Sequence, residues 1–494
     1  MRSFIVAVLL VIPSLAGAAP PPDFDARVQA ALERFDTPGA AVAIVEDGSV
    51  TLARGYGLRG LGSVEKVGAD TLFQIGSVSK AFTAAALATL VDEGKIGWDD
   101  PVIDHLPEFR MYDAWVTREI TVRDLLVHRS GLGLGQGDLL FVPATTISRA
   151  ETVRRIRHLK PVSSFRSTYA YDNVLYIVAG QLIEAVTGQT WEEYVRERLL
   201  RPAGMLRSVT SDAERFEEPD RAFPHARLGE IRGVGPQKAL DEKAVALGVN
   251  SAPAGAIASS ANDLARWIMV QLAGGRIPGS EQRLFSEENG REMWQVVVPM
   301  PPSPLPEKLA DAMPRFRGYA LGWIVQDYRG HRIIYHGGGT QGFRAIVVLL
   351  PEKNVGFAIV VNSEDSGLIP GLQYELLDHY LGLPRRDWVT EFAEFMDDRH
   401  AQALQKLRAA RKERPRSKPS LPLAAYAGKY ADPWYGPIEI REEGGRLVID
   451  FLQTPGMSGP LEHWAYDTFI ARWTDPVIEP AYVSFALDPD GNNI

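Results

Sequence analysis

Short apolar runs that alternate with turn residues mark the first and the last part of the N-terminal 400 residues. Ala40–Val45 and Val50–Gly55 flank an Asp-Gly turn, and Arg344–Leu350 and Val355–Asn362 flank Pro351–Asn354. Apolar runs of this length around a tight turn predict β-hairpins. Because both pairs are apolar enough to be buried, we expect one antiparallel sheet assembled from segments that are far apart in the sequence.

Between these hairpins the apolar positions recur with helical spacing from about Ser77 to Met269. This period predicts amphipathic or buried helices. The expected helices are Phe24–Phe35 ahead of the first hairpin and, in the middle of the chain, Ala81–Asp92, Val122–Val127, Asn173–Val186 and Trp191–Leu200. The fold class predicted for this region is α+β, an antiparallel sheet flanked by helices with a second, all-helical lobe.

The pattern changes again near residue 401. Ala401–Arg411 has helical spacing, and Lys412–Pro422 is rich in charge and proline, so residues 401–422 are expected to form a helix and a linker. Four strand-like segments follow: Pro437–Arg441, Arg446–Phe451, Trp464–Trp473 and Ala481–Leu487. They predict a small β-barrel-like domain over residues 423–494. The sequence stops at a turn signal, Asp490-Gly491-Asn492, with no returning strand, which leaves open a truncation of a longer protein.

The first residues have the pattern of a secretory signal peptide. Arg2 precedes the apolar run Phe4–Leu15 and the small residues Ala16–Ala19, so residues 1–18 are expected to be removed after Ala18. The run is short for a membrane span, and no later stretch approaches 18 consecutive apolar residues. We therefore expect a secreted or periplasmic protein with no stable membrane span.

Composition narrows the functional classes. The 494 residues carry a net charge of −9, which argues against nucleic acid as a partner. There is no cysteine, which excludes disulfides, thiolate nucleophiles and cysteine-ligated metals. Gly55-x-Gly57-x-x-Gly60 matches a dinucleotide fingerprint, but no helix is predicted after it. We expect neither a metal nor an organic cofactor.

The strongest candidate for chemistry is Ser77-Val-Ser-Lys80. A serine hydroxyl needs a base, and a lysine three residues further along lies on the same face of a helix. An apolar helix follows Lys80, and burial there would favour its neutral amine. A second copy of the motif, Ser63 to Lys66, lies in a polar stretch without such a helix. The surroundings therefore favour Ser77 as the nucleophile.

Two further motifs carry groups that could complete such a site. Tyr171-Asp-Asn173 opens a predicted helix, where a phenol can move a proton and an amide can orient a substrate, although asparagine is also common at helix starts. His336-Gly-Gly338-Gly339 lies at the edge of a predicted strand, where glycines let a substrate approach the backbone. The histidine could offer a hydrogen bond or a positive charge to an anionic group, or it could be a satisfied core residue.

These three motifs in this order resemble those of the active-site-serine, penicillin-recognising enzymes. Further segments are similar to the class C β-lactamase branch, which includes esterases and D-amino-acid peptidases: Leu125–Leu132, Leu200–Met205, Pro253–Gly255, Ser259–Trp267 and Tyr319–Trp323. The resemblance covers most of a catalytic domain placed at residues 19–400. The segment after Tyr426 is similar to the lipocalin-like domain often appended to such hydrolases.

The resemblance implies a role for each motif residue. Ser77 would attack a carbonyl, Lys80 would take its proton, and Tyr171 with Lys80 would help to hydrolyse the acyl-enzyme. Asn173 would contact the substrate, and the backbone N–H groups of Ser77 and Gly339 would hold the oxyanion. His336 and Gly338 stand in the element where β-lactamases carry a lysine, a hydroxyl residue and glycine.

That departure favours ester or peptide chemistry over efficient β-lactam hydrolysis. The function expected is an exported serine hydrolase acting through an acyl-enzyme on a D-amino-acid peptide, a peptidoglycan stem or a small ester. The alternatives are a penicillin-binding sensor or scaffold that acylates without turnover, and a true β-lactamase. The expected partner is a small-molecule or peptide substrate, with a homo-oligomer through the β domain as a further possibility.

Overall fold

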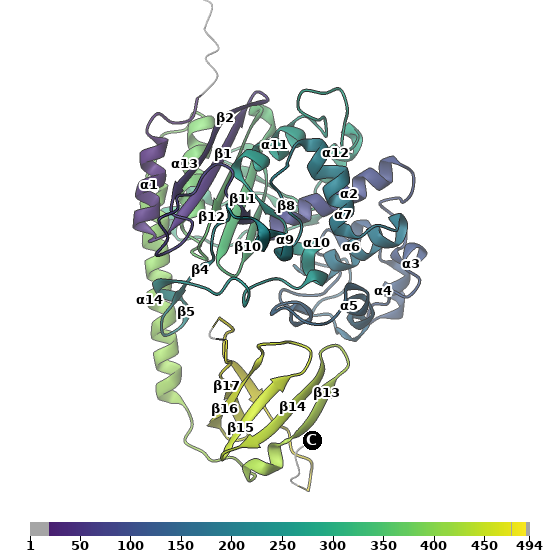
Figure 1. Cartoon of the computed structure of the whole chain (residues 1–494), viewed down its shortest axis with the longest axis vertical. Helices are drawn as coiled ribbons and strands as arrows, with labels where there is room; N and C mark the ends of the chain where they lie inside the picture. The colour runs from purple at the N-terminus through teal and green to yellow at the C-terminus, as the bar shows by residue number, and fades with distance from the viewer. Residues whose placement is uncertain (1–18, 476, 491–494) are drawn as a thin grey trace, which may run out of the picture.

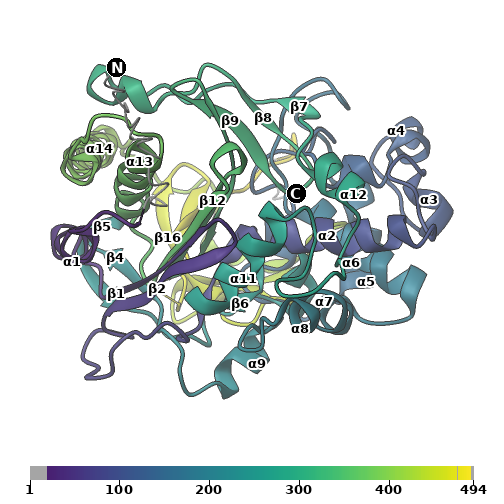
Figure 2. The same ribbon diagram turned by 90° about the horizontal axis from the view of Figure 1, so that it is seen from above.

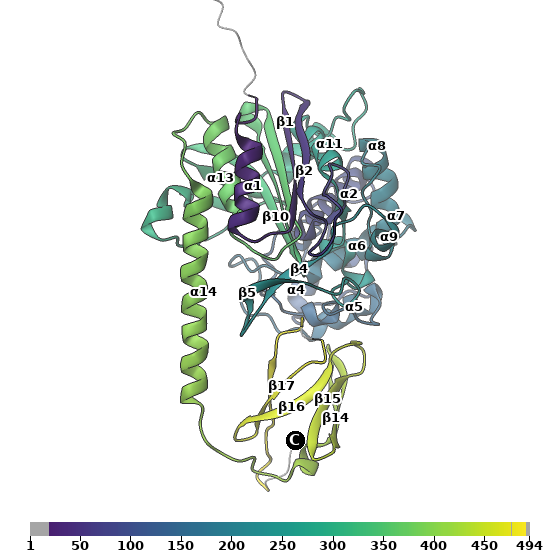
Figure 3. The ribbon, with the colours of Figure 1, turned by 60° about the vertical axis from the view of Figure 1, so that its left-hand side comes forward.

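A computed structural model describes residues 19–475 and 477–490 of the chain, and the predicted signal peptide lies outside this range. A sheet lobe and a helical lobe lie side by side, and a smaller C-terminal sheet sits below both of them (Figure 1). A long helix, α14 (Trp388–Glu413), runs from the sheet lobe down to the C-terminal sheet (Figure 3).

The large sheet has eight strands in the order β2-β1-β12-β11-β10-β9-β8-β7. Their bounds are β1 (Gly39–Glu46), β2 (Ser49–Gly57), β7 (Val298–Pro299), β8 (Arg317–Tyr319), β9 (Ile324–Tyr328), β10 (His331–Thr340), β11 (Phe343–Leu350) and β12 (Val355–Val361). Strand β1 pairs with β12 from Ala40 opposite Val361 to Glu46 opposite Val355. The prediction of one antiparallel sheet built from both hairpins is confirmed.

Both faces of this sheet are covered, which is why its central strands read as continuous apolar runs. One face packs on α1 (Phe24–Arg34), α13 (Leu368–Tyr380) and the start of α14, through residues such as Val42 and Val348. The alternate residues, such as Ala43 and Val347, face α11 (Ala261–Leu272) and the helical lobe. Figure 2 shows the helices on both sides of the sheet.

The helical lobe surrounds α2 (Ser79–Asp92), which is buried on every side from Ser79 to Leu90. Its many alanines let neighbouring helices approach closely, and Phe82 stacks on Trp267 with ring centroids 3.9 Å apart. The other helices of the lobe are α3 (Val102–His105), α4 (Ala114–Glu119), α5 (Arg149–Arg155), α6 (Val174–Thr187), α7 (Trp191–Val195), α8 (Arg201–Ala203), α9 (Asp212–Glu217), α10 (Ala252–Gly255) and α12 (Glu287–Met293).

One expected helix is reduced to a turn. Val122–Val127 contains only a single 3-10 turn, Arg123–Leu125. The buried carboxylate of Asp124 accepts hydrogen bonds from the backbone N–H and the hydroxyl of Thr121, both at 3.0 Å. Such local side-chain bonds compete with the helical pattern.

The C-terminal region differs from its prediction in two places. Helix α14 begins at Trp388 rather than Ala401, because Asp387 caps it and its first turns, including Trp388 and Phe392, are buried against the sheet lobe. The single strand expected over Trp464–Trp473 is a hairpin with a turn at Tyr466, whose φ is 50°.

The C-terminal sheet is an up-and-down antiparallel meander in the order β13 to β18. Its strands are β13 (Gly428–Asp432), β14 (Gly436–Glu443), β15 (Arg446–Phe451), β16 (Ser458–Ala465), β17 (Thr468–Ala471) and β18 (Ala481–Ser484). This fits a barrel-like domain. A two-stranded hairpin, β4 (His225–Leu228) and β5 (Arg232–Ala239), lies between this sheet and the large one (Figure 3). No helix in the described part of the chain is long and apolar enough to cross a membrane.

Candidate active site

Ser77 lies in a one-turn 3-10 helix, Gly76–Val78, that leads directly into α2. The backbone of Gly76 has a φ of 52°, and a Cβ atom there would lie 2.5 Å from the amide nitrogen of Gly339. Only glycine tolerates both the conformation and the close approach. The Ser77 turn is thereby held directly against β10.

The amine of Lys80 is fully buried and is surrounded by three oxygen atoms. Its Nζ lies 2.9 Å from Ser77 Oγ, 2.8 Å from Asn173 Oδ1 and 2.9 Å from the carbonyl oxygen of Ala254. A neutral amine has two N–H donors and one lone pair. It can donate to the amide and carbonyl oxygens and accept the hydroxyl proton of Ser77.

Burial favours this neutral form. Desolvation lowers the pKa of Lys80 to about 7, and the negative charges of Asp138 and Asp172 oppose the shift. A group with a pKa near neutrality is well suited to accept and return a proton. Lys80 therefore has both the geometry and the pKa of a general base.

Tyr171 approaches the nucleophile from a second direction. Its hydroxyl donates to Ser77 Oγ at 2.9 Å, and Lys80 Nζ lies 5.1 Å from the centre of its ring. Burial raises the pKa of Tyr171 well above its usual range, so the phenol keeps its proton at neutral pH. It can therefore serve as a proton donor next to Ser77.

Asn173 connects the lysine to a carboxylate that the sequence analysis did not identify. Its Nδ2 donates to both oxygens of Asp138, at 3.1 and 3.2 Å, which orients its Oδ1 toward Lys80. Burial raises the pKa of Asp138 to about 6. No motif marks Asp138; the only signal was its place in the Gly-rich loop after the Leu125–Leu132 segment.

The backbone of β10 supplies a second N–H group for an oxyanion. The Gln341–Gly342 turn makes Thr340 and Phe343 a hydrogen-bonded pair, so the N–H of Gly339 points away from β11. On that side β9 pairs with β10 only as far as Tyr335, and the Ser77 turn occupies the open edge. The N–H groups of Ser77 and Gly339 are therefore placed to act together.

Gly338 and His336 do not line the catalytic cavity. A Cβ atom on Gly338 would overlap the carbonyl oxygen of Ile75, so this glycine permits the contact between β10 and the Ser77 turn. His336 is 2 % exposed, and its Nε2 lies 2.8 Å from the hydroxyl of Tyr319. Burial lowers its pKa to about 3, so it carries no positive charge at neutral pH. Substrate contact by these two residues stays a prediction that this geometry does not favour.

The second Ser-x-x-Lys copy is not part of this site. Ser63 and Lys66 lie in a loop after β2, and the Ser63 hydroxyl accepts a bond from the backbone of Glu65 at 3.0 Å. The two copies of the motif therefore differ in their environment: Ser63 and Lys66 lie in a loop, whereas Ser77 and Lys80 lie at the start of the buried helix α2.

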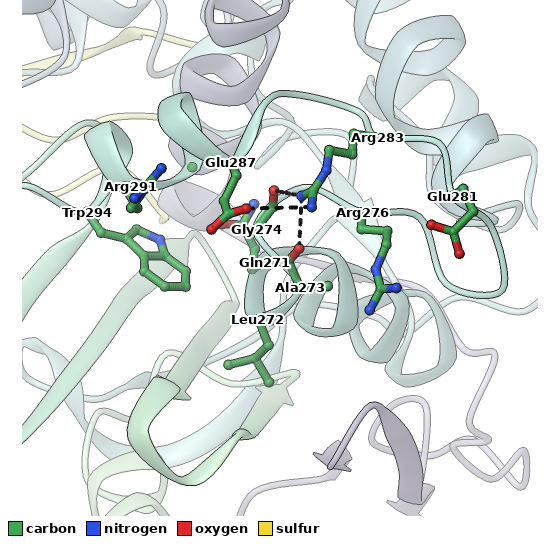
Figure 4. A pocket seen from close by; sticks show the side chains of 11 residues that line it. Gln271, Leu272, Ala273, Gly274, Arg276, Glu281, Arg283, Glu287, Arg291 and Trp294 are labelled. Atoms are coloured by element: carbon green, nitrogen blue, oxygen red, sulfur yellow. Dashed lines mark hydrogen bonds and ion pairs between the residues drawn. The ribbon is translucent and has the colours of Figure 1, made fainter.

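A cavity of about 720 Å³ opens beside Ser77. Asp138 and Asn173 line one part of it, and Gly339 and Arg344 line another. The segment Val477–Glu479 of the C-terminal domain forms part of the wall, so both domains enclose the cavity. A different pocket, of about 430 Å³ between α11 and α12, shares no residue with it; there Arg283 is bound to Glu287 and to two backbone carbonyls (Figure 4).

A family model described as Beta-lactamase matches residues 24–370, which include Ser77, Lys80, Tyr171, Asn173 and Gly339. This chain belongs to the beta-lactamase family. A second model, for a domain of unknown function (DUF3471), matches residues 412–493. Within this family the protein is a serine hydrolase.

Curated relatives agree with this assignment. The chain is 30% identical to unguisins hydrolase ungD of Aspergillus violaceofuscus, over 95% of this chain and 86% of the relative. It is 32% identical to unguisins hydrolase ungD' of Aspergillus campestris, over 87% and 79%. It is also 25% identical to protein flp of Staphylococcus aureus, over 72% and 66%.

Solved structures share the fold over nearly the full length. The octameric penicillin-binding protein homologue from Pyrococcus abyssi matches with a TM-score of 0.63 at 22% identity, over 95% of this chain and 96% of that one. A protein named SurE matches with a TM-score of 0.57 at 21% identity, over 95% of each chain.

Proposed function

We propose that this hydrolase cleaves an ester or amide bond through an acyl-enzyme on Ser77. The observation that carries the proposal is the contact of Ser77 Oγ with both Lys80 Nζ and the Tyr171 hydroxyl, each at 2.9 Å, at the wall of a cavity. One group can accept the serine proton and the other can donate a proton.

In the acylation step the Ser77 proton passes to Lys80, and Oγ bonds to the substrate carbonyl carbon. The oxyanion is held by the N–H groups of Ser77 and Gly339. The bond to the leaving group then breaks, and the leaving group takes a proton from Tyr171, which Lys80 replenishes. In deacylation a water molecule attacks the acyl-enzyme ester and its proton passes to the neutral amine of Lys80. The bond to Ser77 Oγ then breaks, and Oγ takes that proton from Lys80.

The substrate class we propose is a peptide, a D-amino-acid peptide or a small ester. The neutral, buried His336 and the glycines beside it offer neither the ammonium nor the hydroxyl with which a β-lactam carboxylate could pair. Two relatives are named as unguisins hydrolases rather than as β-lactamases. Their names support a hydrolase with a substrate other than a β-lactam.

Three wider proposals accompany this function. Residues 1–18 direct export to the periplasm or the medium, as their sequence pattern predicts. The C-terminal meander is a lipocalin-like domain, supported by its up-and-down strand order. The octameric state named for the Pyrococcus abyssi homologue supports an oligomer of this chain as well.

The test compares wild type with Ser77→Ala and, as a matched control, Ser63→Ala in the second motif copy. We expect sustained p-nitrophenyl ester turnover in wild type and in Ser63→Ala, and none in Ser77→Ala. A fluorescent β-lactam that labels wild type should not label Ser77→Ala. A burst that stops after one equivalent would favour the acylating sensor, and labelling that survives Ser77→Ala would remove Ser77 from the mechanism.

A further inference from the structure

Arg344 is the second residue of β11 and lies directly opposite Gly339 in the sheet register. Its side chain covers Gly339 so closely that a Cβ atom on this glycine would lie 2.5 Å from Arg344 Nη1. Arg344 also lines the catalytic cavity. A guanidinium group thus stands beside the backbone that we assign to the oxyanion.

The positive charge of Arg344 has no acidic partner among the residues that the structure describes. Its Nη1 donates to the carbonyl oxygens of Thr340 and Phe343, both at 3.2 Å, and its Nε and Nη2 have no hydrogen-bond acceptor in that part of the chain. An arginine fork presents these remaining donors in one plane, which suits a carboxylate.

The two carboxylates whose charges act on Arg344 are engaged elsewhere. Glu364 pairs with Arg232, whose Nε lies 2.9 Å from Glu364 Oε2, and it also accepts the N–H of Gly342 at 2.8 Å. Asp365 pairs with Arg227 at 2.8 Å. Both carboxylates favour the charged guanidinium from a distance, but neither forms an ion pair with it among the described residues.

Arg344 is only half-buried, but the desolvation of its guanidinium makes this arrangement costly when the cavity holds no anion. Desolvation lowers the pKa of Arg344 from its ordinary value, yet a guanidinium stays protonated at neutral pH. A buried charge without a partner is unfavourable, and a ligand that supplies the opposite charge removes that cost. Among the described residues, the Ser77 end of the cavity has no comparable unpaired cation, since the pKa of Lys80 is about 7 and His336 is neutral.

We propose that Arg344 binds a carboxylate of the substrate and thereby selects anionic esters or peptides for hydrolysis at Ser77. The inference rests on the hydrolase function proposed above and names its substrate class. Gly339 lies between the two groups: its N–H points away from β11, and Arg344 contacts the face of β10 on which a Gly339 Cβ atom would lie. We therefore place the carboxylate on the Arg344 side of Gly339, in the same cavity as the Ser77 hydroxyl.

The experiment measures kcat/KM for matched neutral and anionic esters with the full chain. On the acyl side, p-nitrophenyl butyrate is compared with mono-p-nitrophenyl succinate. On the leaving-group side, phenyl acetate is compared with 4-carboxyphenyl acetate. The variants are Arg344→Met, Arg344→Lys and, as a matched control, Arg276→Met, an exposed arginine that lines the other pocket and has no ion pair in the described chain.

We expect Arg344→Met to lose about 10- to 100-fold in kcat/KM for the anionic ester of one pair, mainly through KM, and little for its neutral partner. Arg344→Lys should recover part of this loss, and Arg276→Met should change nothing. The pair that responds shows whether the carboxylate lies in the acyl or the leaving group.

Equal losses for neutral and anionic esters would show that Arg344 only holds the Thr340–Phe343 turn, and no change in either pair would equally overturn the proposal. Thermal unfolding of each variant identifies a loss of activity that comes from misfolding. If Arg344→Met is misfolded, the kcat/KM of Arg344→Lys relative to wild type, for the anionic and the neutral ester, tests the proposal instead. Wild-type turnover that disappears in Ser77→Ala keeps the proposed function intact whatever the result at Arg344.

Discussion

At the scale of single residues, the proposed mechanism makes activity depend on the charge of Lys80. The ammonium form cannot accept the Ser77 proton, so activity needs the neutral amine, which is populated as pH rises through its pKa. Because burial brings that pKa to about 7, kcat/KM for a neutral ester should increase with pH and reach half its maximum near 7. Lys80→Arg should lose at least about 100-fold in kcat/KM at every pH, since arginine stays protonated. A profile that is flat from pH 5 to 9 would contradict this role.

Asp138 is expected to tune that profile. Its negative charge favours the ammonium form and raises the pKa of Lys80. Asp138→Asn removes the charge and keeps an oxygen for Asn173, so the rising limb should move to lower pH by roughly half a unit to one unit. Asp47→Asn, at the exposed β1–β2 turn, is the control. If the limb moves to higher pH or stays in place, Asp138 does not act through Lys80.

At the scale of elements, the contact between β10 and the Ser77 turn depends on Gly338. A methyl group there would overlap the Ile75 carbonyl, whereas a methyl group on Gly337 would meet only the Ala345 carbonyl at an ordinary 3.8 Å. Gly338→Ala should therefore separate the two oxyanion N–H groups and reduce kcat by about 100-fold or more, and Gly337→Ala should stay within a few-fold of wild type. Ester kinetics with near-UV circular dichroism measure both effects. Similar activity in the two variants would contradict this account.

The same elements show where sequence reasoning was sufficient. The hairpins and α2 were predicted close to their observed bounds, because continuous apolar runs and an alanine-rich helix can be buried in few ways. The prediction of a helix around Val122 was wrong because the Asp124 side chain accepts hydrogen bonds from its own turn. The spacing of apolar residues contains no information about such a contact.

At the scale of the whole molecule, the C-terminal domain completes the wall of the catalytic cavity. Val477 packs with Ala226 and Val245 of the first domain, and its carbonyl oxygen accepts a bond from Arg232. Arg232 in turn pairs with Glu364, which holds the β10–β11 turn through Gly342. A continuous chain of contacts therefore links this domain to the backbone beside Ser77.

Removing the side chains of Val477–Glu479 from the cavity wall should widen the substrate range. With Val477–Glu479 replaced by three glycines, kcat/KM for a p-nitrophenyl ester of a long acyl chain should rise several-fold relative to that for the acetate, because the cavity loses one side. A chain ending after Pro422 should show the same change, and light scattering should show whether its mass per particle falls. Unchanged substrate preference in both forms would exclude the domain from the site.

The sequence by itself identified Ser77, Lys80 and Tyr171 as candidate catalytic residues, and it predicted the antiparallel sheet against which the Ser77 turn packs. Each of these is recorded locally, as a motif on a helix start or an apolar run next to a turn. Only the tertiary structure decided which partners surround them: it brought Asp138 to Asn173, buried His336 without charge, left Arg344 without an acid and placed Val477–Glu479 against the cavity. Charge state and exposure depend on neighbours that are distant in the chain, and for that reason no local pattern could specify them.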